Sequence, residues 1–249
     1  METLKGKKIV IFGGTGELMG HIALGLAQQQ ARIIIIGRDP QKAQQIQQQD
    51  SHKLIQFIQF NILEDDCHLL FDNIYKKYEY IDGLINGAGV NSSTPFLEIN
   101  DSEINNIFEI NFNFVCKCCQ IYIQKTLQLQ KPGRIINIGS VSALNPLSKV
   151  FMYSASKAAV HNLSKNLARE YGSDNITTNI LVPGFFPAEQ NRKILSPERV
   201  SQIISQTPMN RFGNPSELIG MVTLLLGEQG TFINGAELVV DGGYSVTKI

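Results

Sequence analysis

Short apolar runs alternate with helical patterns from one end of this 249-residue chain to the other. The runs are rich in Ile and Val, and they are apolar throughout rather than at every second position. Strands of that kind are typical of a parallel sheet whose two faces are both covered by helices. The predicted strands span residues 8–13, 32–36, 54–60, 81–86, 135–138, 176–182 and 238–240.

Segments with helical periodicity fill the intervals between these strands. They span residues 18–30, 40–49, 65–78, 101–129, the segment from around Tyr153 to about residue 171, 197–206 and 215–227. Asp101 is a candidate N-cap for the longest of them. No linker, repeat or low-complexity tract divides the chain. We therefore predict an α/β fold over residues 1–249: a single Rossmann-like doubly wound domain, with a seven-stranded parallel sheet flanked by helices on both faces.

The composition argues against several classes of function. Hydrophobic residues make up 43% of the chain and charged residues 18%, which supports a large buried core. The formal net charge is zero and no run of Lys and Arg exceeds a pair, so neither nucleic acid nor a membrane surface is expected as a partner. No segment is apolar enough to span a bilayer, and the amino terminus does not resemble a signal peptide, so a cytoplasmic protein is expected.

The spacing of cysteines and histidines predicts no metal site. Three of the four cysteines fall on one predicted helix at offsets unlike those of a zinc site, and no two histidines are four residues apart. We interpret the cysteines as packing residues of a reducing compartment, and the histidines as structural or surface residues. The residues concerned are Cys67, Cys116, Cys118, Cys119, His21, His52, His68 and His161.

A glycine-rich turn joins the first predicted strand to the first predicted helix. Glycines let the backbone turn sharply and approach a pyrophosphate, and the helix that follows presents amide donors and the positive end of its dipole. The turn therefore predicts a dinucleotide-binding site. Its expected contributors are Gly14, Thr15, Gly16, Leu18, Met19 and Gly20.

The end of the second strand bears on which dinucleotide binds. An acidic residue there bonds the 2′-hydroxyl of NAD, but Gly37 occupies the position and Arg38 follows it. A guanidinium suits a 2′-phosphate through paired, charge-assisted hydrogen bonds. We favour NADP(H) over NAD(H) on this basis. Asp39 could instead reach a ribose and favour NAD, and an acidic Glu17 also counts against NADP(H).

Tyr153 and Lys157 are the strongest candidates for catalysis. They lie four residues apart in a helical pattern, so their side chains share one face. A phenol beside a fixed ammonium is expected to have a lowered pKa, which suits a general acid/base near neutral pH. Ser140 follows the fifth predicted strand, and Asn111 lies in the long predicted helix.

These four residues, in this order behind a glycine-rich turn, resemble the catalytic tetrad of the short-chain dehydrogenase/reductase family. The resemblance covers essentially the whole chain. It implies an oxidoreductase that moves a hydride between a nicotinamide cofactor and a carbonyl/alcohol pair. It also implies that Tyr153 transfers the proton while Ser140 hydrogen-bonds the substrate oxygen. Lys157 would lower the Tyr153 pKa and hold the nicotinamide ribose, and Asn111 would hold a water in a proton relay.

The same resemblance implies further cofactor contacts. The segment Asn86-Gly87-Ala88-Gly89, after the fourth strand, is similar to the family's Asn-Asn-Ala-Gly. Pro183-Gly184, after the sixth strand, is similar to the family's turn beside the nicotinamide. Asn61 and Ile62 stand where the family has an Asp and an apolar residue against the adenine. Tyr153, Lys157 and Phe186 complete the set of expected cofactor-binding residues.

The chain departs from the family pattern at three further positions. In the family's Thr-Gly-x-x-x-Gly-x-Gly turn, Gly13 replaces the Thr and Leu18 replaces the second Gly. Ala188 stands where members often carry a Thr that bonds the carboxamide, so a backbone group of Phe185 or Phe186 would have to replace that bond. A second hypothesis is therefore a catalytically silent nucleotide-binding protein on the same scaffold.

The tail of the chain resembles the sugar-acid branches of the family. Residues 183–192 and 207–220 are similar to D-mannonate oxidoreductase and gluconate 5-dehydrogenase branches, which implies a fructuronate/mannonate or 5-ketogluconate/gluconate substrate. Arg192 is the expected partner of the carboxylate, with Ser140 and Tyr153 at the carbonyl. Residues 90–98 and 185–205 are the expected substrate rim. The enzymatic alternative is a 3-oxoacyl-(acyl-carrier-protein) reductase, to which the tail is less completely similar.

The long predicted helix and the Tyr153 helix both carry apolar residues on more than one face. Family members commonly pair these two helices across a two-fold axis, so the resemblance implies a homo-oligomer, and a homotetramer is expected. On the long helix, an apolar belt is expected to need cover beyond its own sheet. It comprises Phe112, Phe114, Val115, Cys118, Cys119 and Tyr122.

Overall fold

The computed structural model describes residues 4–187 and 196–246. Its strands form a parallel, seven-stranded sheet in the order β3-β2-β1-β4-β5-β6-β7, which confirms the predicted α/β, Rossmann-like fold. The winding of the chain reverses between β1 and β4, which are neighbours in the sheet. The strands are β1 (Lys8–Phe12), β2 (Arg32–Gly37), β3 (Ile55–Gln59), β4 (Gly83–Asn86), β5 (Gly133–Ile138), β6 (Ile176–Pro183) and β7 (Glu237–Val240).

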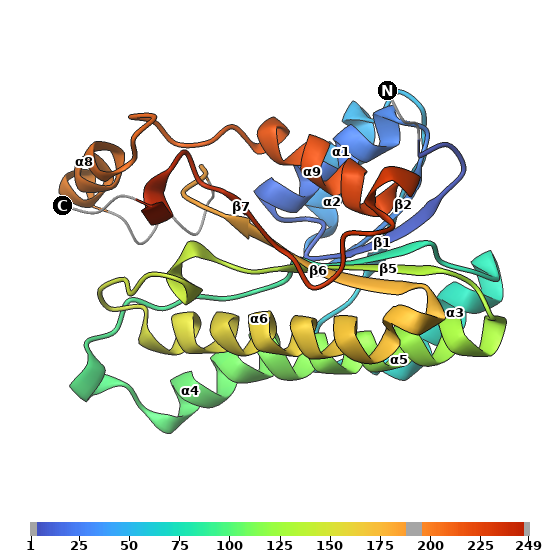
Figure 1. Ribbon diagram of the computed structural model, residues 1–249, viewed down its shortest axis with the longest axis horizontal. Helices are drawn as coiled ribbons and strands as arrows, with labels where there is room; N and C mark the ends of the chain where they lie inside the picture. Colours follow the sequence, from blue (N-terminus) through green and yellow to red (C-terminus); the bar gives the residue numbers. More distant parts are fainter. Residues whose placement is uncertain (1–3, 188–195, 247–249) are drawn as a thin grey trace.

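Helices cover both faces of this sheet (Figure 1). One face carries α1 (Glu17–Gln28), α2 (Pro40–Gln49) and α9 (Ile219–Leu226), and the other carries α3 (Cys67–Tyr78), α4 (Asp101–Phe108), α5 (Phe114–Leu129) and α6 (Phe151–Tyr171). α8 (Pro197–Gln206) lies at the end of the molecule toward which the strands run. Single turns of 3-10 helix span Phe96–Glu98, Val141–Ala143, Gly172–Asp174, Pro215–Leu218, Glu228–Gly230 and Tyr244–Val246.

Strand β2 shows why the predicted strands are apolar throughout. Its four isoleucines are at most 1% exposed, and they alternate between the two faces of the sheet. Ile33 and Ile35 join the core beneath α1 and α9, whereas Ile34 and Ile36 join the core beneath α3 and α5. Each fully buried isoleucine contributes on the order of 2–3 kcal/mol. A strand buried on both faces therefore favours apolar side chains at every position, and polar residues such as Asn137 and Asn179 enter the other strands with hydrogen-bond partners.

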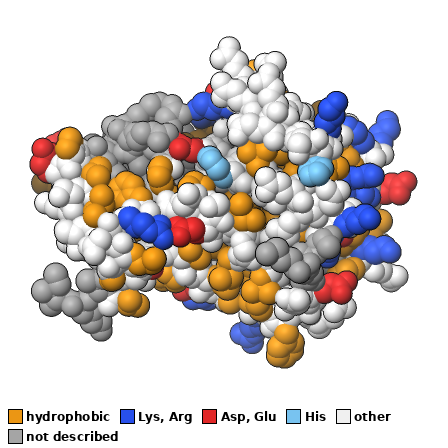
Figure 2. Space-filling view, turned by 90° about the horizontal axis from the view of Figure 1, so that it is seen from above, with side chains coloured by type: hydrophobic (Ala, Val, Ile, Leu, Met, Phe, Trp, Pro, Cys, Tyr) orange, Lys and Arg blue, Asp and Glu red, His pale blue; other side chains and the backbone are white. Residues whose placement is uncertain are grey.

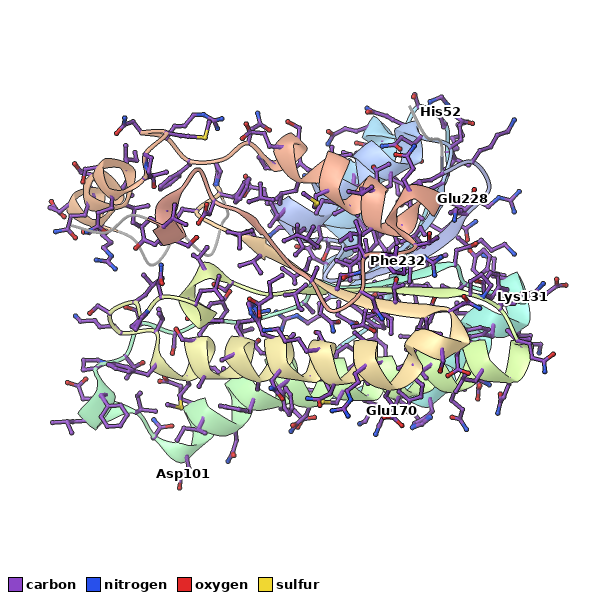
Figure 3. All side chains as sticks on the ribbon, in the orientation of Figure 1. His52, Asp101, Lys131, Glu170, Glu228 and Phe232 are labelled. Carbon is purple, nitrogen blue, oxygen red and sulfur yellow. The ribbon has the colours of Figure 1, made fainter. Side chains whose placement is uncertain are left out.

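The long predicted helix is present, but it is not uniform. α4 passes through a π-helical segment (Glu109–Asn113) into α5, so that Asp101 and Lys131 lie at opposite ends of the molecule (Figure 3). The prediction that Asp101 is the N-cap is wrong. The cap is Asn100, whose extended backbone lets its side chain accept a hydrogen bond from the Glu103 amide at 3.0 Å.

The predicted apolar belt does not need cover from outside. Phe114, Val115, Cys118, Cys119 and Tyr122 are all buried in a core that α5 shares with the sheet, α3 and α6, and Phe112 packs against that core. The expected cover beyond the sheet is present, and it comes from α3 and α6 of the same chain. Periodicity identifies an apolar face without saying what lies against it. Within the described ranges, no helix has the length and hydropathy that a membrane span requires.

Candidate active site

A large cleft opens at the carboxyl ends of the strands, where the winding of the sheet reverses. Its volume is about 1280 Å³, and it is lined by the turns that follow β1 to β6 together with the start of α8. Ligands of doubly wound sheets bind at this place because the turns diverge there. Residues predicted to bind the cofactor and residues predicted to be catalytic both line this cleft.

The turn after β1 is shaped to receive a diphosphate. Gly13 has a φ of +73°, and a Cβ on it would lie 2.7 Å from the backbone nitrogen of Ala88, so the two turns approach too closely for any side chain. Gly16 is the N-cap of α1 and provides no side-chain cap for the first amide groups of the helix. Uncapped amides at a helix start favour an anion, so the residues present fit a dinucleotide.

Most of the predicted cofactor residues line this cleft. Three do not, and each of them packs in the interior. A Cβ on Gly14 would meet Ile35, one on Gly20 would meet Ile46, and the Asn86 amide donates to Asn137 Oδ1 at 2.8 Å. Those that line the cleft are Thr15, Gly16, Leu18, Met19, Arg38, Asn61, Ile62, Gly87, Ala88, Gly89, Tyr153, Lys157, Pro183, Gly184 and Phe186.

Two predicted residues lie outside the described part of the chain. They are Arg192, the expected carboxylate partner, and Ala188. Of the predicted rim, Val90, Asn91 and Ser93 line the cleft on one side, and Phe185, Phe186, Ser196 and Arg199 line it on the other. Lys149 also lines it and was missed by sequence analysis, whereas Arg199 lay within the predicted rim without being singled out.

Ser140, Tyr153 and Lys157 meet at the floor of the cleft. Ser140 leaves β5 with an extended backbone and its side chain hydrogen-bonds Tyr153. The Ser140 hydroxyl also lies 3.0 Å from the Ser142 hydroxyl. Lys157 is buried, and its Nζ donates to the carbonyl oxygen of Ile138 at 2.8 Å. Helix α6 and the end of strand β5 thus bring the three predicted side chains together.

The predicted fall of the Tyr153 pKa is wrong. Burial of the phenol raises its pKa, and the hydrogen bond from Ser140 opposes this only in part, although part of the residue faces the cleft. The Lys157 ammonium is directed to Ile138 and lies 5.8 Å from the centre of the Tyr153 ring. Burial also lowers the Lys157 pKa to about 8. Desolvation therefore dominates the pKa of both groups.

Asn111 is fully buried and lies behind the cleft rather than in its wall. It belongs to the π-helical segment, whose extra residue turns its side chain toward Val90. Its Oδ1 accepts from the Val90 amide at 2.8 Å, and its Nδ2 donates to the Val90 carbonyl at 2.9 Å and to the Ser156 hydroxyl at 3.1 Å. These bonds join the turn after β4 to α6.

His161, which the sequence predicted to be a structural or surface residue, lies close to this site. The residue is buried on α6 beneath the Ser140 turn. Extending the spacing of Tyr153 and Lys157 by one more helical turn would have found it. No group of three or more His, Cys, Asp or Glu within residues 4–187 and 196–246 is placed to hold a metal ion.

Comparison with known proteins agrees with this geometry. A family model described as Enoyl-(Acyl carrier protein) reductase matches residues 19–245. The 5-keto-D-gluconate 5-reductase of Escherichia coli is 30% identical to the chain, over 98% of this chain and 97% of that protein. The chain belongs to the short-chain dehydrogenase/reductase family. A 3-oxoacyl-(acyl-carrier-protein) reductase of Aquifex aeolicus, another similar protein, is 29% identical, over 96% and 98% of the two chains.

The structures of this family extend the agreement. A gluconate 5-dehydrogenase from Burkholderia cenocepacia, solved with NADP and tartrate, superposes with a TM-score of 0.92 at 27% identity, over 99% of this chain and 98% of that one. The protein is therefore a short-chain oxidoreductase that acts on an alcohol or ketone group of a small molecule with a nicotinamide nucleotide. On the face seen in Figure 2, basic side chains gather along the right-hand edge with a few acidic ones among them, and hydrophobic side chains are scattered over the rest.

Proposed function

We propose that this short-chain dehydrogenase/reductase interconverts a carbonyl and a secondary alcohol of an acyclic sugar acid, with NADP(H) as cofactor and Tyr153 as general acid/base. The observation that carries the proposal is the hydrogen-bonded pair of Ser140 and Tyr153, in a cleft whose substrate end is cationic and rich in hydroxyls. We define the substrate end by Ser93, Ser140, Ser142, Ser148, Lys149, Tyr153, Ser196 and Arg199.

The charges along the cleft support a carboxylate substrate. Among the described residues that line it, the two carboxylates are Glu17 and Asp39, and both belong to the turns after β1 and β2, at the cofactor end. Lys149, in the turn after β5, and Arg199, in α8, both line the substrate end. A guanidinium binds a carboxylate well, so Arg199 joins Arg192 as a candidate partner. Two similar proteins, quoted above, are named for gluconate or its 5-keto form.

The chemistry assigned to the chain follows from its protonation states. The bound nicotinamide supplies or accepts the hydride. Because burial raises the Tyr153 pKa, the phenol carries its proton at neutral pH and can donate it to a carbonyl oxygen. The Ser140 hydroxyl donates a hydrogen bond to the same oxygen. Lys157, still largely charged at neutral pH, stabilises the phenolate that remains and holds the nicotinamide ribose. Asn111, braced by Val90 and Ser156, holds the water of a proton relay.

The preference for NADP(H) has support at the end of β2. A Cβ on Gly37 would overlap the Thr15 side chain, so no acidic side chain fits there without moving Thr15. Asp39 accepts a hydrogen bond from the Lys42 amide at 3.0 Å and so serves as the N-cap of α2. Arg38 and Lys42 both line this part of the cleft. These two cations suit a 2′-phosphate better than a ribose hydroxyl.

An Arg38→Asp exchange tests the cofactor preference. We expect the KM for NADPH to rise on the order of tenfold or more, while the KM for NADH changes little, because a charge-assisted phosphate contact is worth about 1.5–3 kcal/mol. Arg32→Asp, at the exposed start of the same strand, is the matched control. An equal effect of Arg38→Asp on both cofactors would remove the 2′-phosphate argument.

Turnover assays test the function itself. We expect NADPH-dependent reduction of D-fructuronate or 5-keto-D-gluconate, and a loss of at least about a hundredfold in kcat for Tyr153→Phe, since general acid catalysis contributes roughly 10²–10⁴-fold. Tyr171→Phe, at the far end of α6, controls for the loss of a phenol. Turnover of 3-oxoacyl thioesters alone would instead support the acyl-carrier alternative, which the Aquifex similarity favours. Nucleotide binding without turnover would support the silent binder.

We also propose that the chain forms one domain, with its substrate rim at residues 90–98 and 185–205, and that it assembles as a homotetramer. The layer that α4, α5 and α6 form carries exposed apolar side chains, among them Phe151, Leu127 and Leu129. A second pocket of about 600 Å³ in the same layer is lined mainly by residues of α5 and α6, which include Leu127, Leu163 and Leu167. Apolar surface of this kind is stabilised when a second copy covers it.

A further inference from the structure

His161 lies against the turn that carries Ser140. It belongs to α6, one helical turn after Lys157, and it is only 4% exposed. Its Nε2 accepts a hydrogen bond from the backbone N–H of Ser140 at 3.4 Å. A Cβ on Gly139 would overlap the imidazole ring, so the turn approaches this closely only because that residue is glycine. The imidazole therefore touches both residues of the turn.

The other ring nitrogen faces the last strand. Nδ1 lies 3.2 Å from Oε1 of Glu237 on β7, and the same carboxylate oxygen lies 2.5 Å from Nζ of Lys165. These partners determine the tautomer. The Ser140 amide can only donate, so Nε2 must offer a lone pair, and the ring proton therefore sits on Nδ1 and points to Glu237. The arrangement requires a neutral imidazole.

His161 and Lys157 hold successive parts of the same strand exit. Lys157 donates to the carbonyl oxygen of Ile138, and His161 accepts from the amide of Ser140. Because the two residues are four apart on α6, one helix face fixes the backbone on either side of Gly139. The direction of the Ser140 side chain follows from that backbone, whose φ is −161° and ψ is 146°.

We propose that His161 is a positioning residue: as a neutral imidazole held by Glu237, it fixes the Ser140 turn, and its protonation releases that turn and misplaces the Ser140 hydroxyl. This inference rests on the proposed function, in which Ser140 hydrogen-bonds the substrate oxygen. Protonation would put an N–H of the imidazolium opposite the N–H of Ser140, where two donors repel each other.

The charges around the ring set the direction of the pH response. The described groups that face it are Glu237 from β7 and Lys157 and Lys165 from α6, whereas Gly139 and Ile180, after β5 and within β6, are uncharged. Burial lowers the His161 pKa below its usual value of 6.5; Glu237 opposes this shift and the two lysines reinforce it. The folded state thus favours the neutral ring. The stability that the neutral His161 ring gives to the fold is fully present above the ordinary histidine pKa. This stability is lost as the pH falls through the lowered pKa of the folded state.

Three variants separate positioning from packing. His161→Leu fills the space but accepts no hydrogen bond, and we expect kcat to fall about tenfold or more at pH 8 with the KM for NADPH unchanged, since small misplacements near a reacting group cost up to roughly a hundredfold. His161→Gln keeps an acceptor, so we expect it to recover most of that loss. Because Gln does not titrate, this variant should also lose the acid limb, the decrease in kcat at low pH. Glu237→Gln keeps the hydrogen bond without the charge, so we expect the acid limb to move to lower pH.

Nitrogen-15 and proton NMR of the free wild-type protein tests the inference independently of any substrate. The expected result is the Nδ1–H tautomer of His161, with a Ser140 amide shift that follows the His161 titration. An Nε2–H tautomer, or a Ser140 amide that ignores the titration, would overturn the proposal even if no substrate were turned over. A His161→Leu variant with wild-type kcat would also overturn it. If that variant does not fold, an acid limb unmoved in Glu237→Gln would refute the proposal.

Discussion

Lys157 carries its charge in a place that disfavours it. The side chain is buried, and its Nζ donates a hydrogen bond to the neutral carbonyl of Ile138. Burial lowers its pKa from 10.5 to about 8. A shift of that size means that the buried ammonium lowers the free energy of unfolding at neutral pH by about 3 kcal/mol. A buried ammonium of this kind destabilises the fold, which is consistent with a role in chemistry.

Lys157→Met should therefore show a stability difference that depends on pH. The folded pKa lies below the unfolded one, so the unfolded state binds more protons between the two values and wild-type stability rises with pH in that window. The free energy of unfolding of Lys157→Met, relative to wild type, should fall by about 3 kcal/mol from pH 7 to pH 10.5. Urea titrations along this range measure it, with Lys165→Met, at a half-exposed site, as control. A difference that stays constant with pH would contradict the assigned burial effect.

Single residues also show what a sequence can and cannot reveal. The spacing of Tyr153 and Lys157 correctly predicted that the two side chains share a face and reach the same cleft as Ser140. The direction of the Tyr153 pKa was predicted wrongly, because it depends on how much water remains around the phenol and on where the ammonium points. Both are set by packing from β5, which a pattern on one helix does not contain.

At the scale of elements, local signals predicted boundaries well where a cap is encoded. α2 and α8 begin and end at the predicted residues, because each starts with a Pro after a capping side chain, Asp39 in one and Ser196 in the other. The π-helical segment of Glu109–Asn113 carries no such signal. It depends on the bonds between Asn111 and Val90, which join segments that are 21 residues apart. The apolar belt shows a related limit, since a helical pattern does not say which neighbour covers it.

At the scale of the whole molecule, the apolar surface of the α4–α5 and α6 layer leads to a test of assembly. We expect light scattering after size-exclusion chromatography to give four times the mass of one chain. Leu127→Glu, at a side chain that is 38% exposed, should shift the mass toward smaller species, because a buried unpaired carboxylate costs several kcal/mol. Gln45→Glu, on the opposite face of the sheet, adds the same charge as a control. A wild-type monomer would refute the proposed tetramer.

The place of Glu237 on the last strand has a consequence for folding during translation. The carboxylate that orients His161 lies 76 residues further along the chain. A growing polypeptide can therefore assemble β1 to β6 and most of the cleft before β7 has been translated. The Ser140 turn receives its final support only when the carboxyl-terminal segment joins the edge of the sheet. Nascent chains and fragments that stop short of β7 would thus hold the catalytic residues in sequence but lack this support.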